Sequence, residues 1–381
     1  MAPAALLTRF SATRPKHEIS QAHSLAWLAA AHAASEATSQ QLDDDARRRF
    51  ETRIARVLER CACPPERISR RGVSVADART TDWGTNAIYD LTLHPHGRGS
   101  GARTRLFSDV VDSYFADAYL DELTAPDDLI HVTCTGYVSP SGAQKLVARR
   151  GWGACTRVSH AYQMGCYAAV PAVRMAAAYL AMEAPSPWRI DIVHTELCSL
   201  HLDPSDHRIE QLVVQSLFAD GLIRYSMVAD DGSPGLRLRA LHEQVLPDSA
   251  QAMSWMVSDW GMQMTLARDV PERIAGALRG FVLELFRRAG LDAGRMKGCV
   301  WAVHPGGPKI IDRVRDVLEL DEAQVAASRQ VLFDHGNMSS ATLPHIWMRL
   351  VDDGGVPRGS LIPSLAFGPG LTVCGALFEK R

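Results

Sequence analysis

Cys166 stands directly after Gly165 and before a run of small and apolar residues of high helix propensity, interrupted early by Pro171. The pattern predicts a buried strand-turn-helix junction over residues 157–175, with the thiol at or near a helix N-terminus. Unpaired backbone N–H groups and the positive end of the helix dipole favour an anion there. A thiolate is the nucleophilic form of cysteine. Taken alone, the same pattern fits a cysteine packed in the core, where this residue type is common.

Two further polar residues occupy turns in the second half of the chain. His304 follows an apolar strand-like run and precedes Pro-Gly-Gly, and Asn337 follows Gly336. Strand-end loops are where α/β sheets place their chemistry, although a lone histidine is often structural and Asn after Gly is ordinarily a turn residue. The Gly-rich segment 365–373 precedes a last strand and could bring a backbone N–H against a thioester carbonyl.

The elements that must position these residues alternate between strand and helix. Strands are predicted at 129–134, 190–194, 222–228, 236–241 and 299–303, with helices after Cys166, over 271–289 and after Pro308. This alternation indicates crossover units on a largely buried sheet, and hence an α/β fold. The turn cluster at 230–235 is the best boundary, which divides the chain into similar halves, 1–232 and 233–381.

Composition limits the class of protein. The chain has 381 residues, 46% of them hydrophobic, and a formal net charge of −2, which predicts a sizeable core and argues against nucleic-acid binding. Eight scattered cysteines, of which only Cys61 and Cys63 are close, fit neither a disulfide scaffold nor a zinc site. The sequence predicts reduced thiols, no bound metal, no membrane span, no signal peptide and a cytoplasmic location.

The N-terminal part is predicted to be helical after a strand and turn over 4–20. One helix starts at Ser20-Gln21 and runs to about residue 37, and a second covers 43–60 with aspartates first and arginines later, the order that the helix dipole favours. The arginines have two interpretations. They form a solvated helix face, or they dock the phosphates of coenzyme A or of a phosphopantetheinyl carrier protein. The residues concerned are Arg49, Arg53, Arg56 and Arg60.

Four segments, in this order, resemble the type III polyketide synthases, the chalcone and stilbene synthase family of the thiolase-like superfamily. They are Gly165-Cys166, His304-Pro-Gly-Gly-Pro308, Gly336-Asn337-Met-Ser-Ser-Ala341 and Ala366-Phe-Gly-Pro-Gly-Leu-Thr372, and Leu217-Phe-Ala-Asp-Gly221 is similar to a further family segment. The resemblance implies a thiolase-like fold whose two similar α/β halves form five layers, αβαβα. The first half would carry the nucleophilic cysteine and the second the histidine and the asparagine.

The resemblance also implies a mechanism. Cys166, as a thiolate paired with protonated His304, takes an acyl starter from a thioester. His304 and Asn337 then donate hydrogen bonds to the thioester oxygen of malonyl coenzyme A while CO₂ leaves, which stabilises the enolate. The enolate attacks the Cys166 ester, and the lengthened chain finally closes to a pyrone or resorcinol-type ring. Decarboxylation drives bond formation, so the resemblance implies coenzyme A thioesters as substrates and no cofactor.

Other residues acquire roles from the same resemblance. Phe218 and Met264 would be gatekeepers, and the flexible thioether of Met264 favours a fatty or β-keto acyl starter over an aromatic one. Ser139 would reach into the cavity of a second subunit, which implies a homodimer. Cys134 is either a cavity residue or a small buried thiol. The remaining assignments are Thr135, Ser339 and Phe367 to the pocket, Gly368 and Gly370 to an oxyanion loop, and Gly306 and Gly307 to docking of coenzyme A or a carrier.

Three alternatives stay open. A ketoacyl synthase III-like enzyme would make a single condensation or join two acyl chains delivered on carrier proteins, and the sequence separates it poorly. A Cys-His-Asn hydrolase shares the order of the three residues, but the papain-type surroundings of the cysteine are absent around Cys166. A catalytically silent thiolase-fold partner is the third, and retention of all three groups argues against it.

Overall fold

The computed structural model describes residues 4–183 and 187–381. Nine of its strands form one sheet in the order β11-β12-β13-β8-β1-β7-β6-β4-β5, and two small hairpin-like sheets pair β9 with β10 and β2 with β3. The strands are β1 Ala5–Thr13, β2 His17–Ser20, β3 Arg70–Val73, β4 Asp128–Thr133, β5 Arg157–Tyr162, β6 Ile190–Leu197, β7 Asp220–Ala229, β8 Leu236–Val245, β9 Met253–Val257, β10 Met262–Leu266, β11 Ala302–Val303, β12 Leu361–Gly368 and β13 Thr372–Lys380.

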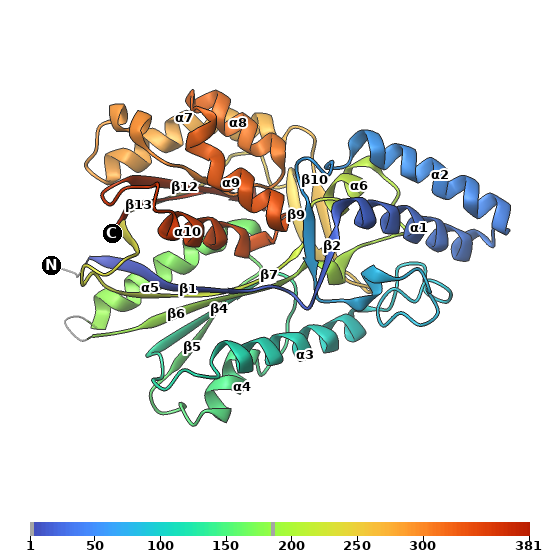
Figure 1. Cartoon of the computed structure of the whole chain (residues 1–381), viewed down its shortest axis with the longest axis horizontal. Helices are drawn as coiled ribbons and strands as arrows, with labels where there is room; N and C mark the ends of the chain where they lie inside the picture. Colours follow the sequence, from blue (N-terminus) through green and yellow to red (C-terminus); the bar gives the residue numbers. More distant parts are fainter. Residues whose placement is uncertain (1–3, 184–186) are drawn as a thin grey trace.

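The large sheet is continuous through β1. This strand pairs antiparallel with β7 at Ala5↔Ala229 and with β8 at Leu6↔Arg237. Figure 1 shows that the two ends of the sheet diverge and enclose the helices α5 and α10 between them. The helices are α1 Gln21–Gln40, α2 Asp44–Cys61, α3 Ser100–Ala118, α4 Gly142–Arg149, α5 Ala169–Glu183, α6 Ile209–Gln215, α7 Val270–Arg288, α8 Pro308–Leu318, α9 Glu322–His335 and α10 Thr342–Asp352.

Three clusters of buried apolar residues match the layers. The central cluster joins α5 and α10 to both parts of the sheet, for example through Val173 and Ile346. A second packs α1 to α4 against the N-terminal part, and a third packs α7 and α8 against the C-terminal part. Helix, sheet, helix, sheet and helix therefore follow one another from α3 to α7 (Figure 1). The sheet is mixed, with parallel pairs at β11–β12, β4–β5 and β4–β6 and antiparallel pairs between, and its faces bury apolar side chains against helices.

Most predicted elements are present, two of them differ from the prediction, and several other elements were not predicted, among them α3, α4, α6, α9, α10 and β12. The strand before Cys166 was predicted to be buried, but β5 is the edge strand of the sheet and is half-exposed. The strand predicted at 299–303 is reduced to two residues, Ala302–Val303. The hairpin of β9 and β10 was not predicted at all. The proposed boundary at 232/233 falls in the loop between β7 and β8.

No helix in the described ranges is long and apolar enough to cross a membrane. Within the same ranges, no three His, Cys, Asp or Glu side chains are grouped as a metal site would need.

Candidate active site

Cys166 lies in the 3-10 turn Gly165–Tyr167, which leads directly into α5. Gly165 has φ +74°, and a Cβ there would lie 2.7 Å from Cδ of Pro369, so only glycine fits this turn. The thiol is buried, at the N-terminal end of a helix that lies in the centre of the molecule. The structure thus places Cys166 as the sequence predicted.

His304 follows β11, which pairs parallel with β12 at Ala302↔Ser364 and Val303↔Leu365. Its backbone N–H donates to the carbonyl of Leu365 at 2.8 Å, which continues that pairing and fixes where the side chain starts. The imidazole is buried, and neither ring nitrogen has a hydrogen-bond partner in the described part of the chain. Because leaving a buried polar atom unpaired costs about 1–3 kcal/mol, the ring is ready to bond to a ligand.

Asn337 is held by the segment that carries Phe218. The backbone N–H of Asn337 donates to the carbonyl of Leu217 at 2.9 Å, and its carbonyl accepts from the N–H of Ala219 at 2.8 Å. The side-chain Oδ1 accepts from the N–H of Ser339 at 3.0 Å, whereas Nδ2 makes only a long 3.4 Å contact to the carbonyl of Gly306. This network assigns the amide orientation. It leaves the donor side of the amide for a ligand.

These three side chains, which are far apart in the sequence, line one cavity of about 1360 Å³, here called the outer cavity. Its walls are mainly apolar. Five further residues that the sequence assigned to the pocket, to the gate or to docking also line it. They are Phe218, Met264, Phe367, Gly306 and Gly307. The apolar residues of the wall that sequence reasoning missed include Val213, Leu217, Met253, Leu266 and Ile274.

Burial shifts the pKa values of Cys166 and His304 in opposite directions. Burial raises the pKa of the Cys166 thiol to about 12, although a hydrogen bond with Ser339 opposes the shift, and burial lowers the pKa of His304 to about 3. The Sγ of Cys166 lies 3.7 Å from Oγ of Ser339. Burial therefore favours the neutral thiol and the neutral imidazole, and the predicted ion pair stays a prediction. A neutral imidazole can accept the thiol proton during reaction.

A second and smaller space, here called the inner chamber, also has Cys166 in its wall. Besides the gatekeepers Phe218 and Met264, three predicted pocket residues line it: Cys134, Thr135 and Ser339. The Sγ of Cys134 is 3.1 Å from Oγ of Ser339. Sequence analysis left two alternatives for Cys134, and both apply: it is a small buried thiol and it also lines a cavity.

Glu196, which sequence reasoning missed, holds the wall of the inner chamber. This fully buried carboxylate accepts from Oγ1 of Thr135 at 3.0 Å, from the backbone N–H of Cys134 at 3.1 Å and from the hydroxyl of Ser340. Burial raises its pKa, and these hydrogen bonds oppose the shift. Its position at the end of the buried strand β6 is a signal that could have revealed it.

The hairpin of β9 and β10 closes the site from another side. Met264 lies opposite Trp255 in the hairpin, and Nε1 of Trp255 donates to the carbonyl of Cys134 at 2.6 Å. Met264 and Phe218 line the outer cavity, the inner chamber and a third pocket of about 570 Å³. The two predicted gatekeepers therefore stand where three spaces meet. Trp255 separates the inner chamber from the third pocket.

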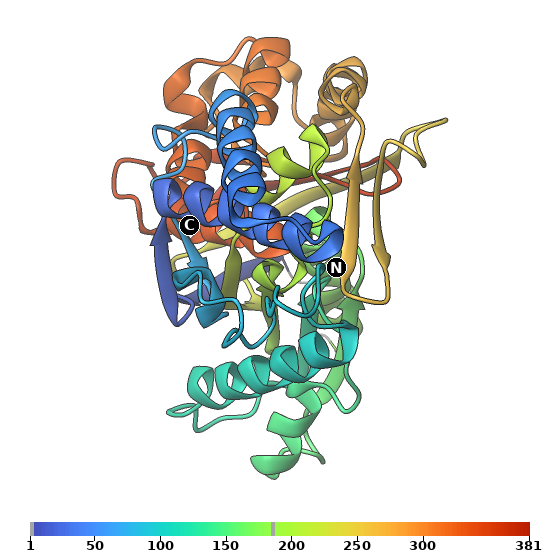
Figure 2. The same ribbon diagram turned by 90° about the vertical axis from the view of Figure 1, so that its right-hand side faces the viewer.

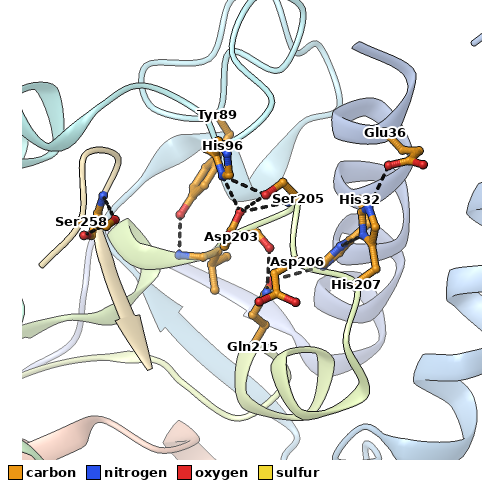
Figure 3. A network of polar contacts seen from close by, with 12 residues as sticks. His32, Glu36, Tyr89, His96, Asp203, Ser205, Asp206, His207, Gln215 and Ser258 are labelled. Carbon is orange, nitrogen blue, oxygen red and sulfur yellow. Dashed lines mark hydrogen bonds and ion pairs between the residues drawn. The ribbon is translucent and has the colours of Figure 1, made fainter. Parts of the chain in front are cut away.

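The wall of the third pocket is tied to α1 by the polar contacts in Figure 3. Asp203 accepts from Nδ1 of His96 at 3.0 Å, and its backbone carbonyl accepts from Nε2 of Gln215 at 2.9 Å. The Oε1 of Gln215 lies 3.2 Å from Nε2 of His32, a buried residue of α1. Because such contacts hold one another in place, the loop after β6 forms a firm wall.

The remaining predicted residues lie elsewhere. Ser139 is exposed and lines none of the three spaces described above, and its proposed reach into a partner stays a prediction. A Cβ on Gly368 would lie 2.3 Å from the ring of Tyr167, and Gly370 has φ +113°. These two glycines let the last loop pack against the nucleophile turn, and their oxyanion role also stays a prediction.

The arginines of α2 do not line the outer cavity. Arg49, Arg53, Arg56 and Arg60 line a separate shallow hollow on the exposed side of the helix. The exposed cations that do line the outer cavity are Arg67 and Lys309, which sequence reasoning did not single out. Lys309 follows the His-Pro-Gly-Gly-Pro motif directly, so its position in the sequence was a usable signal.

Comparison of sequences gives one family and several named relatives. Residues 237–380 match the C-terminal domain of chalcone and stilbene synthases. The chain is 32% identical to the 1,3,6,8-tetrahydroxynaphthalene synthase of Streptomyces coelicolor over 65% of this chain and 64% of that protein. It is 31% identical to the synthase of the same name from Streptomyces griseus over 71% of each chain. Type III polyketide synthase C of Arabidopsis thaliana is 30% identical over 66% of this chain and 67% of that one.

Solved structures of low sequence identity share the fold. The C-terminal type III polyketide synthase domain of Steely1 from Dictyostelium superposes with a TM-score of 0.81 at 24% identity, covering 99% of both chains. The crystal structure of the tetrahydroxynaphthalene synthase of Streptomyces coelicolor gives a TM-score of 0.77 at 24% identity, again over 99% of both chains.

Fold and site together place the protein in the thiolase-like class of α/β proteins, with a buried cysteine, histidine and asparagine around one cavity. Within that class the chain belongs to the type III polyketide synthase family, whose named relatives are condensing acyltransferases. The predicted family and fold class are confirmed.

Proposed function

We propose that the protein is a type III polyketide synthase that loads an acyl starter on Cys166 and extends it with malonyl coenzyme A. The observation that carries the proposal is the meeting of Cys166, His304 and Asn337 at one largely apolar cavity. A nucleophile, a base and an amide donor are the three groups that a decarboxylative condensation needs. Membership of the family supports the same reaction.

Loading begins with the neutral pair. As Sγ of Cys166 attacks the thioester carbonyl, His304 accepts the thiol proton, and the bond from carbonyl carbon to the sulfur of coenzyme A breaks. The imidazole then returns the proton to the departing thiolate. Its unpartnered nitrogens allow both transfers without breaking another hydrogen bond. The acyl group is left on Cys166 and His304 is neutral again.

Extension uses the same imidazole as a donor. Malonyl coenzyme A loses CO₂, and the electron pair of the broken C–C bond moves onto the thioester oxygen as an enolate. The N–H of His304 and Nδ2 of Asn337 donate to that oxygen, where a preorganised donor is worth about 3 kcal/mol in the transition state. The enolate carbon then attacks the carbonyl carbon of the Cys166 ester, whose bond to Sγ breaks. The lengthened β-keto chain leaves on coenzyme A, and the released Cys166 thiolate takes up a proton from water, so that the neutral thiol is restored. Every step balances without a redox or metal cofactor.

The inner chamber gives the growing chain a confined space in which to fold. Its hydrogen-bonded walls fix a small volume beside Cys166. We therefore propose that the reaction ends with cyclisation to a pyrone or resorcinol-type ring.

The two gatekeepers indicate which class of acyl starter the protein uses. Met264 and Phe218 border all three spaces, and the apolar outer cavity offers aliphatic walls. An unbranched thioether re-packs around varied shapes, so we propose a fatty or β-keto acyl starter. Faster turnover of aromatic than of aliphatic acyl thioesters by the purified protein would reject this starter. The exposed Ser139 is consistent with a homodimer in which this residue reaches the partner's cavity.

One experiment also distinguishes two other reactions. A ketoacyl synthase III-like enzyme would stop after one condensation. The Streptomyces relatives are named as 1,3,6,8-tetrahydroxynaphthalene synthases, and formation of that compound is the second reaction to distinguish. Mass spectrometry of the products from malonyl coenzyme A, alone and with a panel of acyl coenzyme A and acyl carrier thioesters, separates these outcomes. We expect chains lengthened by more than one unit and closed to a ring. A product lengthened by a single unit would favour the alternative, and hydrolysed starter alone would refute condensation.

A further inference from the structure

Arg71 is a buried arginine to which sequence analysis gave no role. It lies in β3, where it pairs with Ile19 of β2, and only 3% of its surface is exposed. Burial lowers the pKa of its guanidinium to about 10, so the side chain stays protonated near neutral pH. A buried cation is unfavourable unless its donors are bonded. The groups that it binds therefore indicate its task.

The guanidinium of Arg71 holds the backbone of the segment that carries Phe218. Its Nη1 donates to the carbonyl of Gln215 at 2.8 Å and to the carbonyl of Phe218 at 2.7 Å. Its Nη2 donates to the hydroxyl of Ser24, a buried residue of α1. Because the guanidinium is planar and its donors have a fixed geometry, one side chain holds both carbonyls in a set orientation.

The carbonyl of Phe218 belongs to the same peptide unit as the N–H of Ala219. That N–H donates to the backbone carbonyl of Asn337 at 2.8 Å, and the N–H of Asn337 donates to the carbonyl of Leu217 at 2.9 Å. A peptide unit is planar, so fixing its oxygen also fixes the direction of its N–H. Arg71 and Asn337 therefore hold opposite sides of one peptide plane.

The aliphatic part of Arg71 contacts the turn before Asn337. Gly336 has φ +75°, and a Cβ on it would lie 3.1 Å from Cγ of Arg71. The short sheet of β2 and β3, blue in Figures 1 and 2, packs against α9, the helix that ends directly before Gly336. The backbone N–H of Ser69 donates to the carbonyl of Phe333 near the end of that helix at 2.7 Å. Arg71 thus touches both of the segments that the backbone bridge joins.

These contacts connect Arg71 to one step of the reaction only. It is not among the residues that line the outer cavity or the inner chamber, so it does not meet the substrate in either space. In the reaction proposed above, Asn337 donates to the enolate oxygen during extension and takes no part in loading. A residue that acts through Asn337 should therefore affect extension and leave loading unchanged.

We propose that Arg71 is a positioning residue for extension, which directs the amide of Asn337 at the thioester oxygen of malonyl coenzyme A by clamping the backbone that supports Asn337. The proposal rests on the function proposed above, and it adds a residue that controls one of the two steps without touching the substrate. No bond to Arg71 forms or breaks, because its guanidinium only orients a donor.

The test compares the two steps in the same variants. Loading of Cys166 from octanoyl coenzyme A is followed by intact-protein mass spectrometry, and decarboxylation of malonyl coenzyme A is followed by CO₂ release. Arg71→Met removes the donors and keeps an aliphatic side chain, whereas Arg71→Lys keeps a cation.

The matched control is Arg103→Met. Arg103 lies in α3, is also buried, and likewise donates to backbone carbonyls. These carbonyls belong to Arg98, His96 and Leu200. Circular dichroism melts measure the loss of stability that both substitutions share, so any change of the ratio of the two rates beyond the control is specific to Arg71.

We expect CO₂ release to fall about tenfold or more in Arg71→Met while loading stays within about twofold of the wild type, because a displaced donor slows only the step that uses it. Arg71→Lys should recover CO₂ release to about threefold below the wild type, since an ammonium can reach one carbonyl but lacks the planar fork. The control should change the ratio of the two rates less than about twofold. Equal loss of both steps in Arg71→Met, or unchanged CO₂ release, would overturn the proposal.

A double substitution measures the coupling to Asn337 directly. In an Asn337→Ala background, Arg71→Met should lower CO₂ release by less than a further factor of about two, because the donor that Arg71 orients is already absent. Losses that multiply would show that Arg71 acts independently of Asn337 and would refute the proposal. If Arg71→Met does not fold, Arg71→Lys decides, since unchanged CO₂ release in that variant would count against the clamp.

Failure of the proposed function gives a different result. If the wild type loads octanoyl groups but yields no lengthened chain with malonyl coenzyme A, the proposed function fails and the positioning role fails with it. If the wild type extends the chain normally and the ratio of the two rates is the same in Arg71→Met and in the control, only the positioning role is wrong.

Discussion

The outer cavity and the inner chamber meet at Cys166, and their walls are built in different ways. The outer cavity is the larger of the two and is lined by aliphatic side chains such as Val213, Leu266 and Ile274, which are held by packing alone. The inner chamber is lined by groups locked in place by hydrogen bonds, including the 2.6 Å bond from Trp255 to Cys134.

This difference separates two tasks. Side chains held by packing can change rotamer to admit varied acyl groups. Walls held by a buried hydrogen-bond network resist such changes, because each broken bond leaves an unpaired buried group. We therefore expect substitutions in the outer cavity to change binding and decarboxylation, and those in the inner chamber to change the length and shape of the product.

The largest effect is expected where the two spaces meet. Cys166→Ala removes the only group proposed to carry the acyl chain, so condensation should fall by about 10⁴-fold or more. Decarboxylation of malonyl coenzyme A should continue, since His304 and Asn337 are untouched. Both are followed by product mass spectrometry and by CO₂ release. Cys198→Ala is a matched control, because Cys198 is a second buried cysteine that lines the inner chamber. Condensation that survives in the Cys166 variant would disprove the assignment of the nucleophile.

Asn337→Ala removes an amide donor that lines the outer cavity. Loss of one donor to the enolate oxygen should slow decarboxylation by about 10²–10³-fold. Loading should remain within a few-fold of the wild type, since the nucleophile and its base are retained. Intact-protein mass spectrometry measures the acyl group on Cys166, and CO₂ release measures the other step. Equal loss of both steps would show that Asn337 acts by holding the neighbouring Phe218 segment, to which its backbone is bonded, and not as a donor.

We expect the rate at which Cys166 is alkylated to rise about tenfold per pH unit, because only the thiolate reacts. Burial raises the pKa of Cys166 to about 12, so the thiolate fraction rises steadily as pH increases from 7 to 10. Alkylation of Cys166 by iodoacetamide, followed by peptide mass mapping, should therefore accelerate about tenfold per unit over this range. The exposed Cys155 provides an internal reference for the reagent. A rate independent of pH over the same range would instead indicate a preformed thiolate paired with the protonated His304.

The contrast between the two spaces also marks how far the sequence could predict the site. Cys166, His304 and Asn337 stand in glycine-containing turns, whose local backbone demands leave a signal in the residues themselves. The walls of the outer cavity come from α6, α7 and the β9–β10 hairpin, and Val213 or Ile274 looks like any core residue until the chain is folded. The protonation state of Cys166 is hard to predict for a related reason, since the helix terminus is local and visible, whereas burial, which raises the pKa of the thiol, depends on every surrounding element.

The fold shows the same division. Helix α2 could be placed from Asp43 at its N-terminus and the order of its charges, and Asp43 does cap the helix by accepting from the N–H of Ala46. The edge position of β5 could not be read from its residues, because order in a sheet is set by crossover connections and not by local pattern. The place of Glu196 at the end of β6 could have marked it as a candidate, but the residues around it in the sequence do not reveal the hydrogen bonds that it accepts from Cys134, Thr135 and Ser340.

The smallest effect is expected from substitution of Trp255. This substitution tests most directly whether the outer cavity and the inner chamber have different tasks. This side chain separates the inner chamber from the third pocket, so Trp255→Ala should join the two spaces. The product distribution should shift by a few-fold toward chains with at least one further malonyl unit, while kcat/KM for the starter changes little because the outer cavity keeps its walls. Leu266→Ala, in the outer cavity, is the matched control and should change starter kinetics without lengthening the product. If the Trp255 variant loses starter binding and keeps its product length, the two spaces do not divide the work as their walls suggest.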